Sequence, residues 1–160
     1  MILRLDQKLA GKIHAGPLPA LPAASNPYAD WTARLFTADR TQYILMCNTV
    51  ALYGGVFYGR GVTDVHDLLV RGLEAVRFHA EANGLGLIYH RHIAPLSADV
   101  RCAKALNRSV TGSMNELVEM AKCYLVEMEL APADAAERLN ETPLSALRYA
   151  FAREAIKDLG

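Results

Sequence analysis

The stretch from Thr41 to Gly59 constrains the fold most, because it carries no charged residue. A membrane-spanning helix needs about 20 predominantly apolar residues in one run, and here glycines and polar side chains interrupt the stretch. Its β-branched and aromatic residues instead predict two strands, Gln42–Cys47 and Val50–Tyr58, joined by a tight turn at residues 48–49. Another strand, Trp31–Thr37, precedes these two, and a turn at residues 38–40 joins it to the first of them. Three consecutive strands with short turns predict an antiparallel meander.

The remaining segments add helices and separate strands to this meander. Strands are expected at Ile2–Leu5, Leu85–Ile93 and Val100–Leu106, the last of which could instead be part of a helix. A proline-containing loop is expected at residues 14–30. Apolar residues at helical spacing predict helices at residues 63–83, from Gly112 onward, at Pro132–Leu139 and from Thr142 onward. The order of these elements indicates an α+β domain with an antiparallel, meander-containing sheet, helices on one face of it, and a helical C-terminal third.

Composition limits the class of protein. A chain of 160 residues suits a single domain spanning residues 1–160, large enough to fold without a metal or a disulfide. Its 17 basic and 17 acidic residues give zero net charge, which argues against a dedicated nucleic-acid binder. The three cysteines lie far apart and in apolar runs, which indicates free thiols in a reduced, cytoplasmic setting. No signal peptide, membrane contact or cofactor is expected.

The charges are unevenly distributed along the chain. Residues 1–110 hold 12 basic and 8 acidic residues, whereas residues 111–160 hold 5 basic and 9 acidic residues. Two interpretations stay open, namely two solvated faces or two halves that pair across the interface of a homo-oligomer.

The clearest candidate site is the polar segment from Asn107 to Glu116. Ser113 and Glu116 have the Ser-x-x-Glu spacing of a capping box, which predicts a helix start with free backbone amides. Such a helix terminus beside a guanidinium is a plausible site for a phosphate or carboxylate. The predicted ligand-binding residues are Asn107, Arg108, Ser109, Gly112, Ser113 and Asn115. The structural alternative is that Ser113 only caps the helix and Arg108 pairs with a carboxylate or a carbonyl.

Two other constellations are weaker candidates. His90 and His92 lie two residues apart on an expected strand, so they share a face and could ligate one metal, but a third ligand is not evident. We therefore predict no metal site. Cys102 lies near Arg101 and Lys104, which is the setting of an activated thiol, but a buried free thiol is the favoured interpretation.

The chain resembles an uncharacterised family of small bacterial proteins, a domain of unknown function. The resemblance is carried by Ile2-Leu3-Arg4 with Gln7-Lys8-Leu9, by Asp30-Trp31 and Leu35 to Arg40, by Asn107-Arg108-Ser109-Val110 with Gly112-Ser113-Met114-Asn115, and by Leu139-Asn140 with Pro143-Leu144-Ser145. It implies a single-domain cytoplasmic bacterial protein and no particular activity.

Three functions are compatible with these features, and whether the protein is an enzyme stays open. The first is a non-enzymatic binding or interaction module that self-associates or binds a protein partner. The second is an enzyme or ligand-binding protein that holds an anionic small molecule, a phosphorylated compound or a nucleotide, at the Asn107–Glu116 turn. The third, disfavoured by the zero net charge, is a nucleic-acid accessory protein that uses Arg4, Lys8, Lys12, Arg34 and Arg40.

Overall fold

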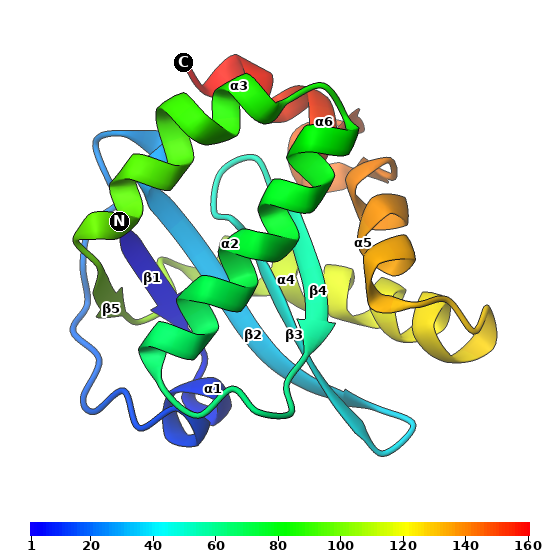
Figure 1. The fold of residues 1–160 in the computed structure, drawn as a ribbon, viewed down its shortest axis with the longest axis horizontal. Coiled ribbons are helices and arrows are strands. Elements are labelled where there is room, and N and C mark those ends of the chain that lie inside the picture. Colours follow the sequence, from blue (N-terminus) through cyan, green and yellow to red (C-terminus); the bar gives the residue numbers. More distant parts are fainter.

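A computed structural model describes all residues, 1–160, and shows an α+β fold built on one mixed five-stranded sheet (Figure 1). The strands lie in the order β4-β3-β2-β1-β5. Their bounds are Ile2–Leu5 for β1, Asp30–Ala38 for β2, Thr41–Asn48 for β3, Gly54–Tyr58 for β4 and Arg101–Ala103 for β5.

The antiparallel meander predicted from the sequence is confirmed for β2, β3 and β4. The hairpin between β2 and β3 closes with Ala38 opposite Thr41. Asp39 and Arg40, which join the two strands, have φ values of 45° and 62°, as in the two-residue turn whose twist suits a hairpin. β4 begins four residues later than predicted. Asn48 explains the delay, because its side-chain oxygen accepts hydrogen bonds from the amides of Val50 and Ala51 and holds this segment as a turn.

The expectation of a wholly antiparallel sheet is wrong, because β1 pairs in parallel with β2 on one side and with β5 on the other. Residues 6–29 separate β1 from β2, and a connection of this length lets the chain return to the same end of the sheet before the next strand starts. A similar return, through the segment that contains α2, precedes β5.

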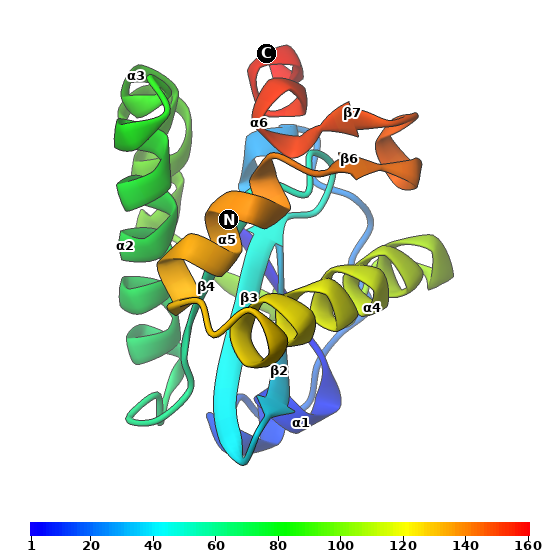
Figure 2. The same ribbon diagram turned by 90° about the vertical axis from the view of Figure 1, so that its right-hand side faces the viewer.

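Helices cover both faces of the sheet, so the prediction of helices on one face is also wrong (Figure 2). α2, Val65–Ala82, lies across one face and α4, Arg108–Lys122, across the other, while α5, Pro132–Asn140, runs along the β4 edge of the sheet. The reason is the apolar character of both sides of β3, whose residues from Ile44 to Cys47 are all buried. A strand that is apolar on both sides needs cover on both sides.

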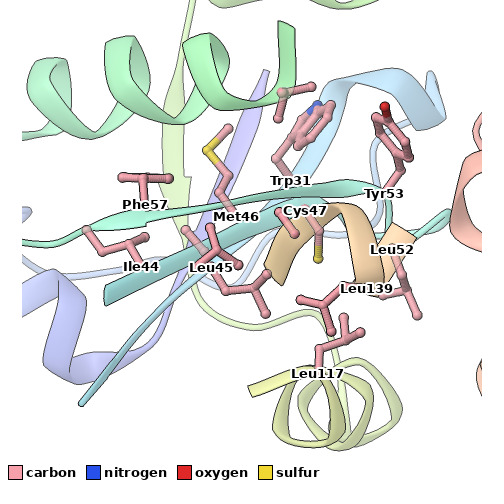
Figure 3. Close-up of a cluster of buried hydrophobic side chains, with 14 of the residues drawn as sticks. Trp31, Ile44, Leu45, Met46, Cys47, Leu52, Tyr53, Phe57, Leu117 and Leu139 are labelled. Carbon is pink, nitrogen blue, oxygen red and sulfur yellow. The ribbon is translucent and has the colours of Figure 1, made fainter. Parts of the chain in front are cut away.

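The alternation of side chains along β3 separates the two core layers (Figure 3). Met46 points toward α2, where Gly72 leaves room for its sulfur, and the next residue, Cys47, places its Sγ 3.3 Å from Met114 Sδ of α4. Gly55 of β4 allows α2 to approach the sheet closely, since a Cβ there would lie 2.7 Å from the Cβ of Ala75 in α2.

The segment predicted as a strand at Leu85–Ile93 is helical. It contains α3, Gly86–Ile88, a π-helical turn at Tyr89–Ile93 and a 3-10 turn at Ala94–Ala98. Its buried residues Leu85, Tyr89 and Ile93 lie four apart, which is the spacing of one helix face rather than the alternation of a strand.

The C-terminal region is less helical than predicted. α5 begins at Pro132 as expected, but no helix starts at Thr142. Instead β6, Pro143–Leu144, pairs with β7, Ala150–Phe151, because Arg148 and Tyr149 both adopt positive φ and reverse the chain. The remaining elements are α1 at Gln7–Lys12, α6 at Ala152–Ala155, a π-helical turn at Cys123–Glu127, and 3-10 turns at Pro27–Ala29, Ser145–Leu147 and Lys157–Leu159. None of the helices has the length and apolar character that crossing a membrane requires.

Candidate functional site

The polar segment singled out in the sequence forms the start of α4, but the helix begins earlier than predicted. Asn107 is the N-cap, with an extended backbone and a side-chain oxygen that accepts a hydrogen bond from the Val110 amide at 2.9 Å. Ser113 lies inside the helix, where its hydroxyl donates to the carbonyl of Ser109. The predicted capping box at Ser113 and Glu116 is therefore wrong. Gly112 does not precede the helix as predicted but lies inside it, and its φ is not positive.

α4 directly follows β5, so its start lies at the carboxyl end of the parallel strands. Here three adjoining pockets run between α1, β2 and α4, and we name them together the strand-end groove. The largest, about 670 Å³, is lined by Leu5, Asp6, Gln7, Ala10, Gly11, His14, Gly16, Leu18, Lys104 and Ala105. The second, about 380 Å³, is lined by Lys8, Arg34, Leu35, Phe36, Thr37, Gln42, Asn115, Val118, Glu119 and Lys122. The third, about 120 Å³, is lined by Leu5, Asp6, Thr32, Ala33, Arg34, Ala105, Val110, Thr111 and Met114.

The small pocket connects the two larger ones. It shares Leu5, Asp6 and Ala105 with the largest pocket and Arg34 with the second. Asp6 is positioned by its place at the end of β1, where one carboxylate oxygen caps α1 by accepting from the Leu9 amide at 2.9 Å. The other oxygen lies 3.9 Å from Nε of Arg34 on β2. Asp6 and Arg34 thus form the contact at the middle of the groove.

The groove carries more positive than negative charge. Four cationic side chains line it, Lys8, Arg34, Lys104 and Lys122, against two carboxylates, Asp6 and Glu119. Glu119 is paired with Lys122 at 3.2 Å, whereas Lys8 and Lys104 have no carboxylate partner within 4.0 Å. Lys12 adds a further cation nearby, because its ammonium donates to Gln42 Oε1 at 3.1 Å. An anionic ligand in the second pocket would meet several cations at once.

The structure brings only part of the predicted ligand set to this groove. Asn115 lines the second pocket. Asn107 is engaged in capping, and the other predicted residues, Arg108, Ser109, Gly112 and Ser113, line none of the three pockets. Arg108 is exposed and makes no ion pair, so the structural alternative of a paired Arg108 is not realised.

A buried ion pair fixes the wall of the groove. Arg4 of β1 is fully buried and makes a two-pronged contact with Asp30 of β2, with N–O distances of 2.7 and 2.8 Å. Its guanidinium also donates to the carbonyls of Leu21 and Pro22 in the proline-containing loop and of Lys104. Arg4 therefore fastens this loop and the groove residue Lys104 to the sheet. Arg4 is not available to a nucleic acid, so its inclusion among the residues of the nucleic-acid hypothesis is wrong.

The electrostatics of Asp30 agree with this role. Burial by itself raises the pKa of the Asp30 carboxyl, but hydrogen bonds from the Arg4 guanidinium and from the Ala24 amide outweigh burial, so the pKa lies below its ordinary value. Asp30 is consequently ionised at neutral pH and holds the loop through Ala24 as well as through Arg4.

The weaker sequence candidates are separated by the fold. His90 and His92 lie in the π-helical turn and not on a strand, so the shared strand face expected for them does not exist. His90 lies 3.3 Å from Glu81, while the ring of His92 stacks on Tyr28 with centroids 5.1 Å apart. Burial raises the pKa of the Cys102 thiol, which makes this cysteine less reactive rather than more.

Sequence reasoning missed Asp6, Lys104 and Lys122 as members of a site. Asp6 and Lys104 each follow a strand immediately, and residues in this position meet at one edge only when the strands are parallel. The position of Asp6 and Lys104 directly after predicted strands was visible in the sequence. It indicates a shared site only once β1 and β5 are known to pair in parallel.

The protein is thus a single mixed sheet that helices cover on both faces. A basic groove lies at the carboxyl ends of its parallel strands. The chain belongs to the family described as a domain of unknown function, DUF6933, whose family model matches residues 2–155. No curated protein and no solved structure matches the chain.

Proposed function

We propose that this protein is a non-enzymatic binding module that holds an anionic small molecule, a phosphorylated compound or a nucleotide, in the strand-end groove. The observation that carries the proposal is the excess of cations, Lys8, Arg34, Lys104 and Lys122 against Asp6 and Glu119, in one groove at the carboxyl ends of parallel strands.

The location of the groove supports this proposal. β1 lies between β2 and β5. The chain places β2, β3 and β4 on one side of β1 first, and later returns to place β5 on its other side. In sheets with parallel strands, ligands commonly bind outside the carboxyl ends of the strands at such a switch in strand order. The first turn of α4 lines the small middle pocket through Val110 and Thr111, and backbone amides and the helix dipole favour negative charge there.

The shape of the groove indicates how such a ligand would be arranged. The anionic group fits the second pocket, where Arg34, Lys8 and Lys122 converge from β2, α1 and α4. A less charged body fits the largest pocket, whose volume of about 670 Å³ is within the range of small-molecule sites. Arg34 can exchange its long contact with Asp6 for a phosphate, because a guanidinium forms paired hydrogen bonds with phosphate oxygens.

The test is thermal stabilisation of the purified protein by inorganic pyrophosphate, nucleoside monophosphates and nucleoside triphosphates. A ligand at 100 times its dissociation constant adds roughly 2.7 kcal/mol to the free energy of unfolding. We expect the shift in the wild type, a much smaller one in Arg34→Ala, and an unchanged one in Arg40→Ala. Arg40 is a matched control because it is exposed at the turn that follows β2 and lies outside the groove.

Arg108→Ala separates the groove from the site predicted from the sequence. Loss of the shift in Arg108→Ala but not in Arg34→Ala would place the ligand on the exposed start of α4 and refute the groove. Absence of a shift with every phosphate compound in the wild type would refute the whole proposal.

A second candidate function is self-association, and one observation favours it. The β6–β7 hairpin exposes Tyr149 to 74% and Phe151 to 39%. A second copy that packs against the hairpin would cover these rings. We expect sedimentation to give a dimer for the wild type and a monomer for Tyr149→Ser, while a monomeric wild type would contradict it.

A further inference from the structure

A histidine lies at a hollow on the opposite edge of the sheet, away from the strand-end groove. His79 of α2 is only 2% exposed, and it lines a pocket of about 300 Å³ between β4, α2 and the start of α5. The residues around this pocket are Val56, Phe57, Arg71, Glu74, Ala75, Phe78, His79 and Ala133, and none of them lines the strand-end groove.

One ring nitrogen of His79 is held from behind by α5. Nδ1 lies 2.9 Å from Oε2 of Glu137, and Nδ2 of Asn83 donates to the same oxygen at 3.3 Å. An ionised carboxylate only accepts hydrogen bonds, so Nδ1 is the donor and, in the neutral ring, Nε2 is left as an acceptor. Glu137 therefore fixes both the orientation and the tautomer of the imidazole.

The other ring nitrogen, Nε2, has no partner in the protein. It makes no hydrogen bond with any other residue. Every fully buried side-chain nitrogen or oxygen in the chain has a partner, so Nε2 keeps a small accessible surface on a residue that lines the pocket. A nearly buried acceptor without a protein partner thus belongs to a side chain of the pocket wall.

The network behind Glu137 keeps this arrangement rigid. Asn83 also donates to the hydroxyl of Tyr53 at 3.4 Å, and burial raises the pKa of Tyr53 to about 12, so the phenol stays neutral beside the carboxylate. On the pocket side, the ring of Phe78 meets that of His79 edge to face with centroids 5.3 Å apart. The imidazole is therefore clamped on both sides.

The walls of the pocket are mostly apolar. Val56, Phe57, Phe78, Ala75 and Ala133 supply aliphatic and aromatic surface. Phe78 is 59% exposed, so its ring adds apolar surface at the rim. Small-molecule sites characteristically combine such walls with a few polar groups that fix orientation.

We propose that this hollow is a second, independent ligand site, for a small apolar molecule that carries one hydroxyl or N–H donor. The apolar body packs against Val56, Phe57 and Phe78, and the donor is received by Nε2 of His79. Satisfying a nearly buried acceptor is more favourable than leaving it with disordered water, which gives preference to a donor-bearing ligand over an isostere without one.

Phenol and anisole test the proposal, because they have the same aromatic ring and only phenol donates a hydrogen bond. Both are titrated into wild-type protein, followed by NMR of the histidine ring nitrogens. We expect phenol to bind about tenfold more tightly than anisole, which is the ratio that one net hydrogen bond supplies. We also expect phenol, and not anisole, to shift the Nε2 resonance of His79.

A blocking variant locates the binding without changing the histidine. Ala133→Phe fills the hollow from its half-buried rim and should abolish phenol binding, whereas Ala131→Phe, at an exposed position outside the pocket, should leave it unchanged. Equal affinity for phenol and anisole, persistence of phenol binding in Ala133→Phe, or no binding of either compound would each overturn the proposal. Both variants should keep any pyrophosphate response of the strand-end groove, so the two sites are tested separately.

Discussion

Replacing Arg4 by methionine tests how the proline-containing loop at residues 14–30 is held against the sheet. Methionine keeps much of the length and apolar stem of arginine but removes the guanidinium, which makes two hydrogen bonds to Asp30 and further ones to the carbonyls of Leu21, Pro22 and Lys104. Asp30 is only 2% exposed, so the variant leaves a buried carboxylate without its cation.

The expected magnitude follows from burial. Breaking a buried ion pair by removing one partner costs about 3–5 kcal/mol, because the remaining charge stays desolvated. For a chain of this size, each kcal/mol lowers the melting temperature by roughly 2–4 °C, so Arg4→Met should melt about 6–20 °C below the wild type. Calorimetry at pH 7 measures this difference directly.

The pH dependence gives a second readout. The pKa of Asp30 is lowered in the folded protein, so its ionised form adds stability above its unfolded-state pKa of about 4, and this contribution is lost as the pH falls through the folded-state value. Without Arg4, burial favours the protonated carboxyl. The difference in unfolding free energy between the variant and the wild type should therefore begin to narrow above about pH 4, where the variant's buried carboxyl takes up a proton, and should narrow further as the pH falls through the lowered pKa of the wild type.

The double variant Arg4→Met/Asp30→Leu provides the control. Removing both partners leaves no unpaired charge, so the double variant should be more stable than the sum of the single effects implies. Strictly additive effects, or an Arg4→Met variant within 1 kcal/mol of the wild type, would refute the reasoning.

Three further substitutions test local features of the fold. Asn107→Ala should destabilise the protein by about 0.5–2 kcal/mol in urea unfolding, because it removes the cap of α4. Ser113→Ala should change the free energy of unfolding by no more than about 0.5 kcal/mol. A larger loss in Ser113→Ala than in Asn107→Ala would favour the capping box predicted from the sequence. Asn140→Ala should cost about 1–3 kcal/mol, because it leaves the buried amide and carbonyl of Gly54 on β4 unpaired, and an unchanged midpoint would show that water replaces the side chain.

The features predicted correctly from the sequence depend on neighbours along the chain. The β2–β3–β4 meander follows from strands separated by short turns, and α2 and α4 follow from apolar residues at helical spacing. The buried residues Met114, Leu117, Val118 and Ala121 of α4 recur at the helical spacing from which this helix was predicted. The segment at Leu85–Ile93 failed because its apolar run is short, and such runs do not distinguish strand from helix by periodicity.

The sequence by itself determined that the chain forms an α+β domain and that Asn107–Glu116 lies at a helix start, because both depend on local patterns. Only the tertiary structure decided that β1 pairs in parallel with β2 and β5, that Arg4 is buried against Asp30, and that Lys8, Arg34 and Lys122 meet in one groove. These contacts join residues far apart in the chain, and no local pattern records which distant segments share an edge of the sheet.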